Sequence, residues 1–450
     1  MSKTKRILSL VIVVVLAAQS SAQVQVRDLP LPGFEQRIRN YIDSLNVIDT
    51  HEHLINPDYV EKSTFNDFMI LLMNFSYDDL VSSGLPKSSF SMLMGDSLST
   101  LEKWYIIKPF WDASRNTAYN RIALIAAKEL FGVNDINGLT VEDLSEKIED
   151  AYKTDWFDRV ITKKCRIQTI ILDMDDRSIN NDHVLYVKKF NSFLNGRTKY
   201  TIDSIGIMQG KMITSLEDYV RALETSYYNA LTEGIVAVKL NIAYKRPLYF
   251  ENVTADQAKK VFKELMSSPE HTLIPFEKVK HLQDYMTYRL LDLAKASSMP
   301  VVIHTGLQAG NGNYLEYSKP TLLSNIFIKY PEINFVLYHG AYPYGGELAA
   351  LAKNFRNVSI DLCWLYAISP SYSERYLSEW LETVPVSKIM AFGGDYQNIE
   401  NIYGELVIAK EIITKVLSDK VRAGYFSESE AKIFAKMMLH DNAAKFYNIQ

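Results

Sequence analysis

The chain has 450 residues, of which 47% are hydrophobic and 12% aromatic, so it is long enough to bury a sizeable core. Its formal net charge is -4, and it contains no basic block or basic helical stripe, which excludes a nucleic-acid surface. Two cysteines are too few for a disulfide scaffold, and we expect Cys165 and Cys363 to be free, buried thiols.

The first 22 residues have the features of a secretory signal peptide. Three cations within the first six residues precede an apolar run over 7–18, and small residues follow at 20–22. The apolar run is shorter than the roughly 20 residues that a membrane span needs. We therefore predict cleavage after Ala22, a periplasmic or secreted protein, and no stable membrane insertion of the mature chain.

A helical pattern over 34–44 leads into the apolar run Val47-Ile48-Asp49-Thr50, which ends in His51 and His53. In a strand, residues i and i+2 point to the same face, so the two imidazoles enter one space. Neutral imidazole is the commonest side-chain ligand for zinc-like ions. We expect this pair to supply two metal ligands.

Residues 54–165 are predicted to form a helical insertion between the first strand and the second. Apolar residues recur at spacings of three and four within this segment. Thr140 is expected to cap one of its helices, with Asp143 in the reciprocal acidic position. An insertion of this length serves either as a lid or wall of a substrate pocket, or as a structural addition or oligomer contact.

From residue 166 onward, strand patterns and helix patterns alternate. The predicted strands are 167–173, 204–209, 235–240, 301–304, 335–339, 358–361 and 389–393. With the strand at Val47 they number eight, which predicts an α/β fold, a (β/α)8 TIM barrel over 23–450 with its active site at the carboxyl ends of the strands. A doubly wound open sheet is the alternative, but it would not bring the first, fifth, sixth and eighth strands around one point.

Three later strands also end in residues that can bind a metal. They deliver His304, His339 and Asp395 to the carboxyl face of the expected barrel. A divalent ion held by His51, His53, His304 and Asp395 would have nitrogen and oxygen ligands, which suit zinc first and then manganese, iron or cobalt. We expect one ion rather than two, although sequence leaves the number open.

Two of these residues are also candidates for proton transfer. Asp395 can accept the proton of a water that the metal activates and pass it to a leaving group. His339 can polarise a carbonyl or shuttle a proton, and its alternative role is a further ligand or a partner of a ligand. We therefore assign catalytic roles to Asp395 and His339.

Substrate-binding groups are expected after the fourth strand. Lys239 ends that strand and has three open roles: carbamylated bridge between two metals, partner of a substrate carboxylate, or counter-charge to Asp395. Just beyond it, Tyr244 and Arg246 are candidates for binding an anionic substrate, since an arginine fork pairs with a carboxylate through two hydrogen bonds. A solvated loop is the alternative for this segment.

These motifs, taken in order, resemble the amidohydrolase superfamily, in particular its amidohydrolase-related branch and the domain fused to glutamine synthetase in some plants and fungi. The motifs are Asp49-Thr50-His51-Glu52-His53, Val302-Ile303-His304-Thr305-Gly306, Leu337-Tyr338-His339-Gly340 and Phe392-Gly393-Gly394-Asp395. The helical insertion resembles that of the uronate isomerases. The resemblance implies a metal-bearing barrel with His51, His53 and Asp395 as its most dependable ligands, and it leaves His304 between ligand and substrate contact.

The expected function is a metal-dependent hydrolase that acts on a small polar substrate, an amide, ester or lactone bearing a carboxylate. Uronate isomerisation or decarboxylation at the same metal is the alternative within enzymes. A binding protein that kept the barrel without the chemistry is the alternative from another class. The expected partner is a small-molecule substrate; the oligomeric state is open and compatible with a homo-oligomer.

Overall fold

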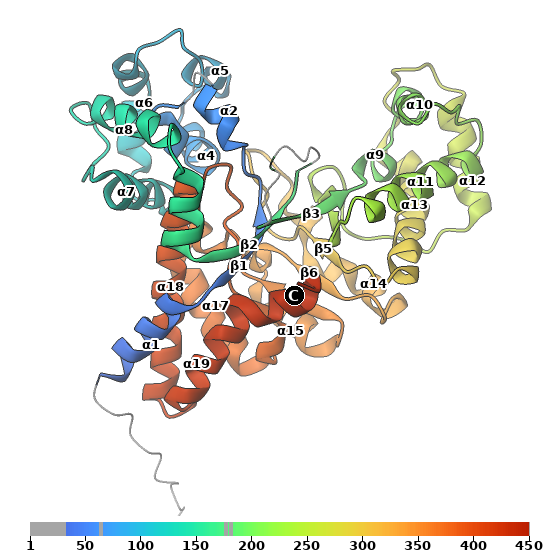
Figure 1. Cartoon of the computed structure of the whole chain (residues 1–450). Helices are drawn as coiled ribbons and strands as arrows, with labels where there is room; N and C mark the ends of the chain where they lie inside the picture. Colours follow the sequence, from blue (N-terminus) through green and yellow to red (C-terminus); the bar gives the residue numbers. More distant parts are fainter. Residues whose placement is uncertain (1–32, 63–65, 175–178, 180–182, 450) are drawn as a thin grey trace, which may run out of the picture.

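The structure, a computed structural model, describes residues 33–62, 66–174, 179 and 183–449 (Figure 1). The predicted signal peptide lies outside the described residues. No helix of the described part combines the length and the apolar character needed to cross a membrane.

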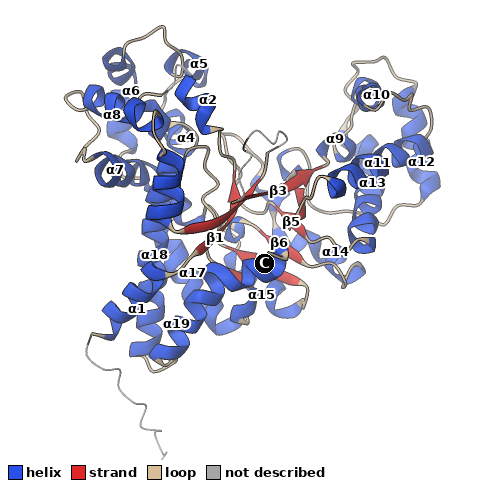
Figure 2. Ribbon diagram, in the orientation of Figure 1, coloured by secondary structure: helices blue, strands red, loops and turns tan. Residues whose placement is uncertain are grey.

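Eight parallel strands stand side by side in chain order and form a nearly closed barrel, which confirms the predicted fold. Helices cover the outside of these strands, as Figure 2 shows. The strands are β1 Val47–Glu52, β2 Ile167–Leu172, β3 Val184–Lys189, β4 Ala237–Leu240, β5 Val301–Ile303, β6 Phe335–Leu337, β7 Val358–Asp361 and β8 Ile389–Met390.

The segment that follows β8 lies against β1 and closes the barrel there. The Thr50 amide donates to the Phe392 carbonyl at 3.1 Å, and the Asp395 amide donates to the His51 carbonyl at 2.8 Å. One step further, the His53 amide donates to the carbonyl of Tyr396 at 3.0 Å. The closing seam of the barrel therefore passes through the residues that the sequence singled out as metal ligands.

The third predicted strand, 204–209, is wrong. Residues 204–208 belong to α10, Lys199–Met208, where Ile205 is buried but Ile207 and Met208 are 79% and 76% exposed, and Gln209 follows the helix. The apolar side chains thus follow the helical period of 3.6 and not the strand period of two. The true third strand is β3, whose last two residues are lysines, so it does not read as an apolar run.

Two groups of helices flank the mouth of the barrel (Figure 1). The first, here called the insertion lobe, lies between β1 and β2; the second, here called the arm, lies on the other side, between β3 and β5. The insertion lobe comprises α2 Pro57–Lys62, α3 Met69–Leu72, α4 Phe75–Ser82, α5 Phe90–Leu93, α6 Thr100–Ser114, α7 Ala118–Phe131, α8 Val141–Tyr152 and the π-helical turn η2 Asp158–Cys165. The arm comprises α9 Asn191–Leu194, α10, α11 Leu216–Thr232, α12 Ala255–Met266 and α13 Phe276–Ala296.

The remaining helices surround the lower part of the barrel. They are α1 Phe34–Ser44, α14 Ser324–Lys329, α15 Gly345–Asn354, α16 Leu365–Ile368, α17 Pro370–Thr383, α18 Ile399–Arg422, α19 Glu428–Lys436 and α20 Asn442–Tyr447. The insertion lobe is fixed to α18 because the buried carboxylate of Glu400 accepts hydrogen bonds from Trp156 at 2.8 Å and Tyr152 at 3.1 Å. The lobe is therefore anchored to the barrel's own wall.

Two local predictions can be compared with the structure. Thr140 precedes α8, but its side chain does not cap that helix; its hydroxyl donates to the carbonyl of Asp135 instead, so the predicted side-chain cap is wrong. Cys165 and Cys363 are both buried and unpaired, as predicted.

Candidate metal centre

Three side chains from the two ends of the chain meet at the seam. His51 and His53 come from β1 and its end, and Asp395 follows β8. One carboxylate oxygen of Asp395 lies 3.1 Å from Nε2 of His51 and 3.1 Å from Nε2 of His53. Among the described residues, these three form a group whose potential ligand atoms all lie within 4.8 Å of one another. The structure thus brings together three of the four predicted metal ligands.

The two imidazoles are oriented for ligation. Nδ1 of His53 lies 3.0 Å from the carbonyl oxygen of Asp173, and since a carbonyl can only accept, Nδ1 donates and Nε2 keeps its lone pair toward Asp395. Burial and the charge of Lys239 lower the pKa of His51 to about 4, so this ring is neutral at neutral pH. Burial opposes protonation of His53 as well, but Asp395 and Asp173 outweigh it and raise its pKa.

Asp395 is held in an uncommon backbone conformation by its neighbours. Its φ is +60°, in the left-handed region that costs a non-glycine residue about 1 kcal/mol or more. The buried carboxylate of Glu52 accepts the amides on both sides, from Gly394 at 2.8 Å and from Tyr396 at 2.6 Å. A Cβ at Gly394 would clash with the carboxylate of Glu52, so glycine is needed there. The residue between the two histidines therefore positions the third ligand.

The donor set fits a divalent metal ion. Two imidazole nitrogens and one carboxylate oxygen suit zinc, iron, manganese or cobalt and leave coordination positions free for substrate. The carboxylate of Asp395 is ionised because, although burial would raise its pKa, His51 and His53 hold that pKa well below its ordinary value. His51 and Asp395 are thus in the protonation state that a metal requires, whereas the raised pKa of His53 favours its protonated ring, which would have to release its proton to bind the ion.

The structure does not place His304 with these ligands, which departs from the prediction. Its Nε2 lies 2.8 Å from the carbonyl of Leu307 and must donate to it. Its Nδ1 then accepts from Nε2 of His339 at 2.9 Å. Both ring nitrogens of His304 are engaged, so His304 lines the pocket as a neutral imidazole, with a pKa that burial lowers to about 3.

His339 lies behind His304 rather than at the pocket surface. It is fully buried, and its Nδ1 faces Sγ of Cys363 at 3.4 Å and the second carboxylate oxygen of Asp395 at 3.8 Å. Its side chain thus connects His304 to Asp395. This position suits the partner role that the sequence left open, beside the predicted catalytic one.

Lys239 is buried at the base of the pocket. Its Nζ lies 3.7 Å from a carboxylate oxygen of Asp173, 3.3 Å from Nε2 of His51 and 4.1 Å from the ring centre of Tyr338. Burial lowers its pKa from the ordinary value. Asp173 also pairs with Lys189 at 2.9 Å, so its charge is shared between two lysines.

The sequence did not identify Asp173 or Lys189 as site residues. Asp173 follows β2 directly, so the rule that selected the other strand ends would have found it. Lys189 ends β3, the strand that was not recognised, and no pattern in the sequence marked it.

The two remaining predicted substrate residues have different positions. The hydroxyl oxygen of Tyr244 accepts the Ala309 amide at 3.0 Å and lines the pocket. Arg246 does not reach the pocket: its buried guanidinium pairs with Asp284 at 2.5 Å and donates to the Tyr249 carbonyl at 3.0 Å. The charge of Arg246 is thus paired within the protein and lies outside the metal pocket, and its role in binding a substrate carboxylate stays a prediction.

The pocket around the three ligands has a volume of about 210 Å³. The insertion lobe contributes Asn74 and Phe75 to its wall, and the amide group of Asn74 donates to the Asp395 carbonyl at 3.3 Å. The insertion is therefore a wall of the pocket, one of the two roles that the sequence left open.

Residues 273–449 match the family model described as Amidohydrolase. Among curated proteins, Protein fluG of Emericella nidulans is 26% identical over 245 residues, which are 52% of this chain. The same match covers 28% of that protein, so this chain spans little more than a quarter of its relative.

Similar solved structures cover nearly the whole chain. Uronate isomerase of Thermotoga maritima has a TM-score of 0.76 at 14% identity, over 92% of this chain and 97% of that one. Glucuronate isomerase of Caulobacter crescentus has a TM-score of 0.76 at 15% identity, with 93% and 94% covered. A putative metal-dependent hydrolase of Lactobacillus casei has a TM-score of 0.65 at 19% identity, with 91% and 97% covered. At these identities the structures share the fold.

Proposed function

We propose that this chain is a member of the amidohydrolase superfamily and a metal-dependent hydrolase of a small, polar, carboxylate-bearing amide, ester or lactone; the match of residues 273–449 to the amidohydrolase family model supports the membership. The observation that carries the proposal is the meeting of His51, His53 and Asp395 within 4.8 Å at the mouth of the barrel. We propose zinc as the metal, because it suits these nitrogen and oxygen donors.

The bound ion would act as a Lewis acid toward a substrate oxygen. The ionised carboxylate of Asp395 accepts a proton from the attacking water and orients it, since its second oxygen is not engaged by the two histidines. Through this oxygen, Asp395 also faces Nδ1 of His339, which offers a path for the proton toward His304 and the pocket.

Two donors in the pocket suit a substrate carboxylate. The ammonium of Lys239 provides the positive charge. The hydroxyl oxygen of Tyr244 acts as the acceptor in its hydrogen bond with the Ala309 amide, so its own O–H can donate to the substrate. Burial raises the pKa of Tyr244, so the hydroxyl keeps its proton.

Uronate isomerisation is the second candidate. It is favoured by one observation, the higher TM-scores to the two uronate isomerases than to the metal-dependent hydrolase. The same pair of proton carriers, Asp395 and His339, would serve an aldose-ketose exchange.

The test is metal content and turnover of natively purified protein, with His51→Ala and the control His271→Ala, an exposed histidine of the arm side. We expect one equivalent of metal and hydrolysis of amides, esters or lactones in the wild type and control, and neither in His51→Ala. Isomerisation of uronates without hydrolysis would replace the proposal by the second candidate. Full metal and turnover in His51→Ala, or no metal even after reconstitution, would overturn both.

We also propose that the protein is exported. The support is the signal-peptide pattern of residues 1–22. The N-terminal sequence of the mature protein tests it: we expect Gln23 first, and an intact Met1 or Ser2 would contradict it.

A further inference from the structure

A second, larger cavity opens beside the metal pocket. This groove has a volume of about 690 Å³ and lies where the arm meets the loop after β4. Asn241 and Tyr244 line both the groove and the metal pocket, so the two spaces adjoin. A substrate bound at the metal can therefore extend past these two side chains into the groove.

The groove carries positive charge that its own lining does not balance. Arg197, Lys245 and Arg246 line it, and none of its described lining residues is an aspartate or glutamate. Only the charge of Arg246 is neutralised, by Asp284. Cations gathered in a hollow with no anion raise the local potential and attract negatively charged ligands.

The guanidinium of Arg197 is oriented before any ligand arrives. Its Nε donates to the carbonyl of Ile274 at 2.8 Å, which fixes the plane of the group and leaves the terminal nitrogens for other acceptors. No ion pair of Arg197 or Lys245 occurs among the residues that the structure describes. A planar, fixed guanidinium is well suited to a carboxylate, which it can bind through two hydrogen bonds.

The rest of the groove suits a carbon chain with polar substituents. Phe276 and Leu273 supply an apolar side, and Asn195 lines the same space with a side-chain oxygen that is buried without a hydrogen-bond partner. The metal pocket alone, at about 210 Å³, is small for such a chain.

We propose that the groove is a subsite for a second anionic group, a carboxylate, on the substrate. The proposal rests on the proposed function and deepens it: the reacting bond lies in the metal pocket, the carbon chain passes Asn241 and Tyr244, and the distal carboxylate binds Arg197 and Lys245. The substrate class is thus an extended dicarboxylate, with one carboxylate beside Lys239 and Tyr244 and the second at the end remote from the reacting bond.

The experiment measures binding of simple acids to the zinc-loaded full chain by titration calorimetry. Monocarboxylates and α,ω-dicarboxylates of increasing chain length are compared, because one carboxylate can occupy the metal pocket while the other reaches the groove. A titration without protein corrects for zinc chelation. Above a threshold length we expect dicarboxylates to bind about tenfold more tightly than matched monocarboxylates, with the advantage reduced at high salt.

Variants assign this advantage to the groove. Arg197→Gln and Lys245→Gln should each remove most of it, while Lys260→Gln, an exposed lysine on α12 outside the groove, changes the net charge equally and should retain it. Melting temperatures of all variants verify folding. An equal loss in all three variants would reduce the effect to general electrostatics and overturn the subsite.

The two proposals fail differently. Equal affinities for mono- and dicarboxylates at every length, with zinc bound, would overturn the groove and leave the proposed function intact. A chain that takes up no zinc would instead overturn the proposed function. A terminal phosphonate that binds more tightly than the best dicarboxylate would overturn the choice of carboxylate in favour of a phosphate group.

Discussion

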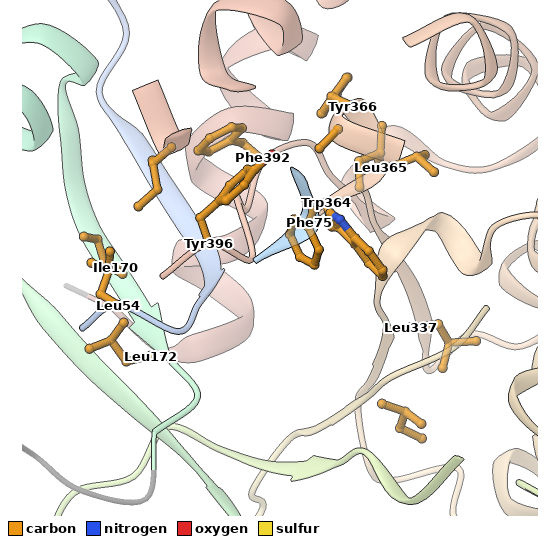
Figure 3. Packing of buried hydrophobic residues seen from close by; sticks show 14 of the residues in the cluster. Leu54, Phe75, Ile170, Leu172, Leu337, Trp364, Leu365, Tyr366, Phe392 and Tyr396 are labelled. Carbon is orange, nitrogen blue, oxygen red and sulfur yellow. The ribbon is translucent and has the colours of Figure 1, made fainter. Parts of the chain in front are cut away.

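The insertion lobe and the arm flank the barrel mouth and meet the site in opposite ways (Figure 1). In the insertion lobe, the ring of Phe75 stacks on Trp364 with centroids 4.4 Å apart and meets Tyr396 edge-on at 5.1 Å (Figure 3). In the arm, most of the residues that line the open groove beside the site are polar or cationic, as Arg197 is.

One side of the barrel opening is therefore tightly packed, and the other is open to a ligand. Close aromatic packing holds the wall next to Asp395, because buried aromatic rings contribute large apolar areas and specific contacts. The open, charged side leaves room and attraction for a ligand. We therefore expect substitutions in the insertion lobe to change mainly stability, and those of Arg197 and Lys245 in the groove to change mainly binding.

The largest expected effect comes from breaking the aromatic wall. Phe75→Ala removes a buried ring and should lower the free energy of unfolding by about 3–5 kcal/mol. Leu273→Ala in the groove, where the side chain is 63% exposed, should change it by less than about 0.5 kcal/mol. Urea unfolding of both variants measures this, and equal losses would show that the two walls do not differ.

Arg246 and Lys245 are neighbours in the chain, but only Arg246 is buried. Arg246→Met leaves the buried carboxylate of Asp284 with less compensation and should cost about 2–3 kcal/mol. Lys245→Met, at an exposed position one residue away, should cost less than about 0.5 kcal/mol. The double variant Arg246→Met/Asp284→Leu should recover part of the loss. Chemical denaturation measures these stabilities. An unchanged stability in Arg246→Met would contradict a structural role of this arginine and favour the predicted ligand-binding role.

Glu52, whose carboxylate accepts the amides on both sides of Asp395 and so acts as a brace on it, is the third residue to test. Glu52→Gln replaces one acceptor oxygen by a donor, leaves a buried amide unpaired, and should cost about 1–2 kcal/mol. Because Asp395 is then held less firmly, zinc affinity should fall about tenfold or more, as measured by competition with a chelator.

The matched control for the brace is Glu400→Gln. This buried carboxylate fixes the insertion lobe to α18, so its loss should lower stability but leave zinc affinity unchanged. The visible spectrum of the cobalt-substituted protein should change only in Glu52→Gln. The same loss of zinc affinity in both variants would contradict a specific brace.

The smallest expected effect is a pH dependence from the barrel interior. Burial raises the pKa of Asp361 from 3.8 to about 7, so ionising it in the folded state costs free energy. The penalty is absent below pH 3.8, grows as pH rises and is complete above about 7, so this residue lowers stability with increasing pH. Asp361→Asn should flatten that fall by about 1 kcal/mol between pH 5 and pH 6, as measured by thermal unfolding.

The control for this dependence lies on the arm. Asp256 is exposed on α12, and Asp256→Asn should leave the pH profile of stability as it is in the wild type. A profile unchanged in both variants would show that Asp361 is not the group responsible.

Much of the fold could be predicted because its signals are local. Apolar runs with helices between them identified seven of the eight strands. β3 does not read as an apolar run because its last two residues are lysines. The three apolar residues within 204–209 fit the strand period of two as well as the helical period of 3.6, so the sequence does not distinguish the two. The predicted number of strands, eight, is therefore right, although one of the eight predicted segments is a helix.

In the candidate site, too, local sequence features predict some residue positions, whereas contacts between distant segments decide others. A spacing of two in a strand is enough to put His51 and His53 on one face, and a strand end is enough to send Asp395 to the same rim. Nothing local indicates that Leu307 and His339 occupy both nitrogens of His304.

By itself the sequence determined the barrel and the three residues that meet at its seam, because strand period and strand-end position are properties of short segments. The tertiary structure alone decided that Arg246 pairs with Asp284 while Arg197 stays available beside the site, and that Glu52 positions Asp395. The physical reason is that the partner of a charged or polar side chain is chosen by which groups are buried together, and those groups lie far apart in the chain.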